Sequence, residues 1–190
     1  MKTLAKNYLL VALMLGTLIT YGNEKTNTTS ANKVTVAYKE VKKGHVLSIK
    51  NNEYITIYSL KIDQNGNFTK TLDLSNLKEG NYSTELEKDS KIIVKYFTVN
   101  KGTVTFENEK TVFKPVIRKE NDLVLISKLE FNKEPLKVKL FYQNEVIVNE
   151  TVEDESKILN RVYKLSKDKS GEYTVIIKTD HRTFTKNFTI

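Results

Sequence analysis

Apolar and polar residues alternate over most of the chain, which is the period-two pattern of β-strands with one buried face. Over 34–38 and 136–140, every second residue is a large apolar one. Turn signals separate such runs, and Asn65-Gly66 is the strongest hairpin signal among them. After residue 33 no stretch has helical periodicity. Many short strands separated by turns predict an all-β fold built of immunoglobulin-like β-sandwiches.

The chain contains an internal repeat with a constant offset of 91 residues. Residues 74–99 align without a gap with 165–190, and nine of the 26 positions are identical. The repeat predicts two tandem sandwiches. The predicted parts are a first sandwich at 33–101, a linker at 102–111 and a second sandwich at 112–190. Val104 and Phe106 also fit a strand of their own, in which case the two sandwiches would pack together.

The repeated Gly-x-Tyr step predicts a tyrosine corner in each sandwich. Gly80 and Gly171 would supply a turn with positive φ, and the rings of Tyr82 and Tyr173 would pack into the cores. In such a corner the tyrosine hydroxyl turns back to the backbone just upstream. The alternative is that both tyrosines are exposed and stack on sugars.

The repeated segments 74–99 and 165–190 resemble the last strands of small immunoglobulin-like modules in exported proteins of Bacteroidetes. In those modules a Leu-Ser-x-Leu-x-x-Gly-x-Tyr step precedes a terminal hairpin. Relatives include the C-terminal sorting domain of the type IX secretion system and short secreted proteins of unassigned role. The resemblance implies an immunoglobulin-like fold and, as an alternative function, sorting. The Pro-Asn-Pro-like start of sorting domains is absent from both copies.

The first 22 residues have the pattern of a secretory signal peptide. Lys2 and Lys6 precede an uncharged, apolar stretch at 8–19. This stretch is shorter than the ~20 residues that a helix needs to cross a membrane, and a retained anchor is the alternative. We expect residues 1–22 to be cleaved, the polar residues 23–32 to be a flexible spacer, and no membrane span to remain. The mature protein would lie in the periplasm, on the cell surface or in the medium.

Composition and charge exclude several classes of partner. The chain has 31 Lys and Arg residues, 23 Asp and Glu residues and a net charge of +8. Only three basic residues are arginine, which nucleic-acid sites favour, so we expect no nucleic-acid partner. The absence of Cys excludes disulfides, thiolate metal sites and a cysteine nucleophile. Lysines on the predicted strand 137–139 oppose edge-to-edge pairing, so we expect a monomer.

No motif in the chain points to catalysis, a cofactor or a metal. Gly-x-Ser-x-Gly, His-Glu-x-x-His and Walker sequences are all absent. His45 and His181 lie beside predicted turns at non-equivalent repeat positions, and we expect both to be exposed. The acidic residues of 150–155 lack the alternating spacing of a calcium loop and predict a solvated loop. The sequence therefore predicts a non-enzyme without catalytic, cofactor-binding or metal-binding residues.

Tyr54 and Tyr58 are the candidate binding residues. If Ile55 and Ile57 face the core from a strand at 54–60, the two tyrosines stand outward on one face. Such neighbouring aromatic rings form a flat patch for a glycan or a protein. Two alternatives stay open: the strand is buried on both faces, or the other sandwich covers it.

These observations predict an exported, non-catalytic binding or structural protein of the cell envelope. Its ligand would be an unidentified protein or glycan. One alternative is a sorting or attachment module of type IX-like secretion. Another is an enzyme with a site between the two sandwiches.

Overall fold

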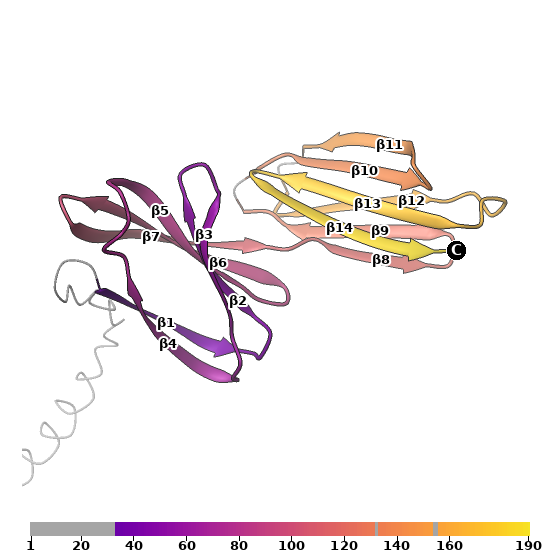
Figure 1. Cartoon of the computed structure of the whole chain (residues 1–190). Helices are drawn as coiled ribbons and strands as arrows, with labels where there is room; N and C mark the ends of the chain where they lie inside the picture. Colours follow the sequence, from indigo (N-terminus) through magenta and orange to yellow (C-terminus); the bar gives the residue numbers. More distant parts are fainter. Residues whose placement is uncertain (1–32, 132, 154–155) are drawn as a thin grey trace, which may run out of the picture.

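The computed structural model describes residues 33–131, 133–153 and 156–190. The predicted signal peptide 1–22 and spacer 23–32 lie outside these residues. The described residues form strands joined by turns, so the predicted all-β class is confirmed. None of them forms a helix that is long and apolar enough to cross a membrane. Figure 1 shows the strands of 33–113 at one end of the molecule and those of 116–190 at the other.

Two antiparallel sheets form the N-terminal sandwich (Figure 1). One sheet pairs β1 (Lys33–Val41) with β4 (Gly66–Asp73). The other contains, from edge to edge, β3 (Thr56–Lys61), β2 (Val46–Asn51), β5 (Gly80–Glu87), β6 (Lys91–Asn100) and β7 (Thr103–Phe113). Alternate side chains of both sheets meet in one buried cluster, which includes Val36, Tyr38, Leu47, Phe68, Leu86 and Phe97. The period-two pattern of the sequence thus gives each sheet one core face.

The C-terminal sandwich repeats this plan with a separate core. Its first sheet contains, from edge to edge, β12 (Ile158–Lys164), β9 (Leu123–Leu129) and β8 (Val116–Glu120). Its second sheet contains, in spatial order, β11 (Glu145–Val152), β10 (Leu136–Tyr142), β13 (Glu172–Thr179) and β14 (Arg182–Thr189). The core between them includes Val124, Ile126, Val138, Leu140, Tyr173 and Ile177.

The segment 102–111, predicted as a linker, is a strand instead. It lies almost entirely in β7, which pairs with β6 at the edge of the five-stranded sheet. Val104 is buried in the N-terminal core and Phe106 packs against it, which explains why the segment joins the sheet. Only Lys114 and Pro115 then separate β7 from β8. The division into domains at 33–101 and 112–190 stays a prediction.

Both Gly-x-Tyr steps have the geometry of a tyrosine corner. Tyr82 and Tyr173 each donate a hydrogen bond from the hydroxyl to the carbonyl oxygen four residues upstream, at 2.9 and 2.7 Å. The preceding glycines have positive φ, +151° at Gly80 and +143° at Gly171, which a residue with a side chain rarely adopts. Each tyrosine thereby fastens the loop before its strand to the edge of its core.

We expect Tyr173→Phe to lower the free energy of unfolding by about 1 kcal/mol, because it removes one largely buried hydrogen bond. Tyr82→Phe should lower it less, since the hydroxyl of Tyr82 is exposed. Urea unfolding followed by circular dichroism measures both changes. Unchanged unfolding midpoints for Tyr173→Phe would contradict a stabilising role of the corner.

Candidate functional site

The predicted tyrosine patch is wrong in the orientation of its strand. Tyr58 is half-buried and packs against the N-terminal core, whereas Ile57 is 44 % exposed. The strand begins only at Thr56, and Tyr54 lies in the preceding turn with φ of +62°. A register shift between β2 and β3 accompanies this turn. Since Tyr58 and Leu60 pack against the core, alternation along β3 places Ile57 on the outer face, and Ile55 precedes the strand.

Tyr54 contacts the C-terminal sandwich rather than standing free. Its ring stacks on the imidazole of His181, with centroids 3.7 Å apart and an interplanar angle of 20°. His181 is exposed, as expected, and lies in the turn between β13 and β14. The other sandwich thus contacts one face of the Tyr54 ring, while the residue stays 40 % exposed.

A buried ion pair joins the two sandwiches at the same turn. Arg182 of β14 donates from its two terminal nitrogens to the two carboxylate oxygens of Glu85 in β5, at 3.0 and 2.8 Å. The Nζ of Lys50 lies 2.8 Å from the same carboxylate. Burial alone would raise the pKa of Glu85, but the bonds from Arg182 and Lys50 outweigh it and hold this pKa below its ordinary value. The carboxylate is therefore charged at neutral pH.

Glu85 faces away from the N-terminal core. Its neighbours Thr84 and Leu86 are fully buried on the core side of β5, so alternation places Glu85 on the outer face of the sheet. That residue is nevertheless only 4 % exposed, because the β13–β14 turn covers this part of the sheet. The junction between the sandwiches is thus a packed contact, built around a charge.

Two further contacts cross the junction. The Nζ of Lys110 in β7 lies 2.9 Å from a carboxylate oxygen of Glu134, in the loop before β10. The rings of Phe113 and Phe131 meet edge to face, with centroids 5.7 Å apart. Together with the ion pair and the Tyr54 stack, these contacts involve β5, β7 and the β2–β3 turn on one side. On the other side they involve the β13–β14 turn and the loop between β9 and β10.

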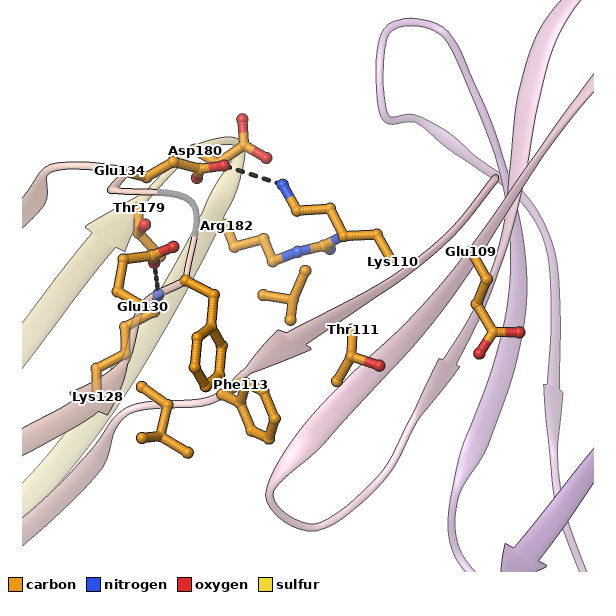
Figure 2. Close-up of a pocket in the computed structure, with 13 residues that line it drawn as sticks. Glu109, Lys110, Thr111, Phe113, Lys128, Glu130, Glu134, Thr179, Asp180 and Arg182 are labelled. Carbon is orange, nitrogen blue, oxygen red and sulfur yellow. Dashed lines mark hydrogen bonds and ion pairs between the residues drawn. The ribbon is translucent and has the colours of Figure 1, made fainter. Parts of the chain in front are cut away.

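A cavity of about 260 Å³ lies between these contacts (Figure 2). Its lining comes from β7, from the end of β9 with the loop that follows, and from the β13–β14 turn. Figure 2 shows Phe113 with apolar side chains at one wall and Arg182, Lys110 and Glu134 along another. Both sandwiches contribute, so the cavity exists only while the junction is formed. Sites at the boundary of two structural units are a common place for ligands.

Buried polar groups line this cavity. Lys128 and Glu130 form an ion pair with both side chains almost fully buried. Thr179 is 3 % exposed, and its hydroxyl has no hydrogen-bond partner among the described residues. The same holds for the Nε of Arg182, whose terminal nitrogens are occupied by Glu85. A buried hydroxyl and N–H without partners are costly unless a ligand or water satisfies them.

His45 is buried, contrary to expectation. Its Nδ1 accepts a hydrogen bond from the backbone N–H of Lys42 at 3.0 Å, and its Nε2 lies 3.4 Å from the carboxylate of Asp89. The imidazole thus satisfies a backbone donor of the β1–β2 turn, which a spacing of three residues allows. Its place in the fold is structural.

The predicted acidic loop includes an ion-pair site between β11 and β12. Glu150 accepts hydrogen bonds from Arg161 at 2.7 Å and from the hydroxyl of Tyr163 at 2.9 Å. The bond from Arg161 lowers the pKa of Glu150. Asp154 and Glu155 lie outside the described residues. Within the described ranges, no group of three or more His, Asp or Glu residues is placed to hold a metal ion.

The sequence analysis missed the junction residues, although the repeat contains a signal for them. The offset of 91 residues places Ile176 at the position of Glu85 and Lys91 at the position of Arg182. The two copies therefore differ at both members of the ion pair. Glu85 is charged, whereas Ile176 at the same position of the other copy is apolar. Such a difference indicates that the surroundings of this position differ between the two copies.

We expect Glu85→Gln to lower the free energy of unfolding by about 3–5 kcal/mol at pH 7, because it leaves Arg182 buried without a counter-charge. A carboxylate with a lowered pKa stabilises the fold above its ordinary value of 4.5 and stops doing so as the pH falls through the lowered pKa. The difference between wild type and variant should therefore shrink in acid. Urea unfolding at a series of pH values measures it.

Glu87→Gln is the matched control for this prediction. Glu87 lies two positions along β5, and its ion pair with Lys114 is largely exposed on the carboxylate side. We expect this variant to change the free energy of unfolding by less than about 1 kcal/mol. Equal effects of the two variants would contradict a special contribution of Glu85.

No protein-family model matches the chain, and no curated protein matches it. Among solved structures, the chain is similar to the BSP domain of a biofilm-associated protein, with 15 % identity and a TM-score of 0.29. That match covers 86 % of this chain and 28 % of the other. A second match, to the human OSCAR ligand-binding domain, has 8 % identity and a TM-score of 0.24, and covers 86 % and 92 % of the two chains. At such values neither similarity carries an argument about function.

Proposed function

We propose that the chain is an exported, non-catalytic binding protein of the cell envelope, and that it binds its ligand in the cavity between the two sandwiches. One observation carries the proposal: the cavity is lined by the buried hydroxyl of Thr179 and Nε of Arg182, which have no hydrogen-bond partner among the described residues. Groups of this kind lose hydrogen bonds to water on folding, and a ligand can restore them. Export rests on the signal-peptide pattern of residues 1–22.

The ligand that fits this cavity best is a single sugar unit. A sugar ring presents hydroxyl groups that donate and accept hydrogen bonds, and a C–H face that packs on aromatic rings. Phe113 and Phe131 offer such rings on one wall, while Thr179 and Arg182 offer polar groups elsewhere. The volume of 260 Å³ is below the ~300–1,000 Å³ of pockets for drug-sized ligands, so the ligand is small.

The charges around the cavity favour a neutral ligand. The three cations in its lining, Lys110, Lys128 and Arg182, each pair with a carboxylate. Glu109 and Asp180 also line the cavity, where Glu109 pairs with Lys95 and Asp180 lies 2.9 Å from His181. An anionic ligand would therefore find no cation in this lining without a carboxylate partner among the described residues. The carboxylate oxygens can instead accept hydrogen bonds from sugar hydroxyls.

Saturation-transfer NMR with a panel of neutral hexoses and N-acetylhexosamines tests the ligand class. We expect at least one sugar to bind, and Thr179→Val to weaken its binding about fivefold through the loss of one hydrogen bond. Thr185→Val, an exposed change on the neighbouring strand β14, is the control and should bind as wild type does. If no sugar binds, or if Thr179→Val binds unchanged, the proposed ligand is wrong.

Intact-mass analysis of native protein from periplasm, outer membrane and medium tests export separately from binding. We expect a species that spans 23–190 outside the cytoplasm, because the apolar stretch is too short to remain as an anchor. A species truncated within 112–190, or carrying added mass at a new C-terminus, would favour the sorting alternative. An uncleaved chain in the inner membrane would contradict export.

A further inference from the structure

The outer face of the sheet β12-β9-β8 carries six aliphatic side chains beside five polar ones, which are Arg118, Glu120, Ser127, Asn160 and Lys164. In β9, Val124 and Ile126 point into the C-terminal core, and the intervening leucines point outward. The outward side chains on the three strands that are aliphatic are Val116, Leu123, Leu125, Leu129, Ile158 and Val162. We call this set the aliphatic face. Four of its members are between 38 % and 58 % exposed, and the two inner leucines are half-buried.

The strand register pairs aliphatic side chains in two rows of this face, and Asn160 and Ser127 form a polar row between them. Ile158 of β12 lies opposite Leu129 of β9, and Val162 lies opposite Leu125. Antiparallel sheets at a protein surface usually carry polar residues on the solvent side. Exposed clusters of aliphatic side chains mark interaction sites. Nothing in the described part of the chain covers these side chains, which leaves the second layer to another molecule.

We propose that the aliphatic face packs against the same face of a second copy of this chain around a two-fold axis. The axis would run roughly parallel to β9, in the plane between the two sheets. Sheets that pack face to face stay nearly aligned and lie ~10 Å apart. Flat, branched aliphatic side chains on both partners suit that packing. The proposal is independent of the cavity and its ligand.

Charge complementarity at one end of the face supports this particular partner and axis. Lys164, Leu123 and Glu120 lie in one row across β12, β9 and β8. A two-fold axis along β9 exchanges the positions of β8 and β12 between the copies. It therefore places Lys164 of each copy opposite Glu120 of the other, twice. This end of the face is thus complementary to itself in charge.

The edge residue Arg118 does not oppose this arrangement. It lies on β8 opposite Leu125, at the border of the face, and its side chain is 63 % exposed. Its guanidinium lies 3.8 Å from the carboxylate of Glu120 and can stay in solvent while its stem packs. The sequence-based expectation of a monomer rested on lysines along strand edges. The predicted edge is wrong, because Lys137 and Lys139 lie on β10, which pairs with both β11 and β13 inside its sheet.

Sedimentation velocity of the exported protein across a wide range of concentrations tests the dimer. We expect a concentration-dependent dimer that Val162→Lys weakens about tenfold or more, since it buries a charge in an apolar contact. Val146→Lys is the matched control, because Val146 is similarly exposed on β11 of the other sheet. It should leave the dimer unchanged. A wild-type chain that stays monomeric, or equal effects of both variants, overturns the proposal and leaves the face to a different protein or a lipid surface.

Charge reversal tests the axis. We expect Lys164→Glu and Glu120→Lys each to weaken the dimer, because each sets like charges against each other twice. The double variant should restore the dimer, since it exchanges the two partners of the same contact. Circular dichroism of each variant verifies that the fold is intact. A double variant that dimerises no better than the single ones overturns the proposed axis.

Discussion

The arrangement of the two sandwiches depends on one buried carboxylate. Glu85 lies on the outer face of a sheet where a charge would normally be solvated, and the C-terminal sandwich removes that solvent. A buried charge of this kind is stable only with a counter-charge in good geometry, which Arg182 supplies with two hydrogen bonds. Since paired hydrogen bonds fix direction as well as distance, the pair sets how the β13–β14 turn sits on the sheet. The cavity beside it follows from that placement.

The internal repeat separates what the fold requires from what the junction requires. Both copies keep the glycine and the tyrosine of the corner, and both corners form the same hydrogen bond to the backbone. The corner needs only residues that are close in sequence, so it can form in each half independently of the other. The ion pair needs one residue from each half, and the copies differ at both positions. The corner residues that both copies share therefore stabilise each sandwich by itself. The ion-pair residues, which differ between the copies, form part of the contact between the sandwiches.

The sequence alone predicted most of the strands, the turns that bound them and the two tyrosine corners, because these depend on period two and on local turn chemistry. It failed for the strand around Ile57, where both faces carry large side chains and alternation does not say which one is buried. Tyr58 and Leu60 pack against the core, so Ile57 between Thr56 and Tyr58 faces outward. It also failed for Glu85 and His45, whose burial depends on contacts with distant residues. Alternation says which face a residue occupies, but not whether another part of the chain covers that face.

The two proposed surfaces meet at the end of β9. Leu129 belongs to the aliphatic face and also lines the cavity, and Glu130 and Phe131 continue the cavity lining. A second sheet packed on the aliphatic face would hold this end of β9 in place, and so would a ligand that contacts Phe131. Any energetic coupling between the two events is reciprocal, because the thermodynamic cycle requires each to change the affinity of the other by the same factor. Such coupling would have to pass through the end of β9, which both surfaces share and which the buried pair of Lys128 and Glu130 holds on its other side.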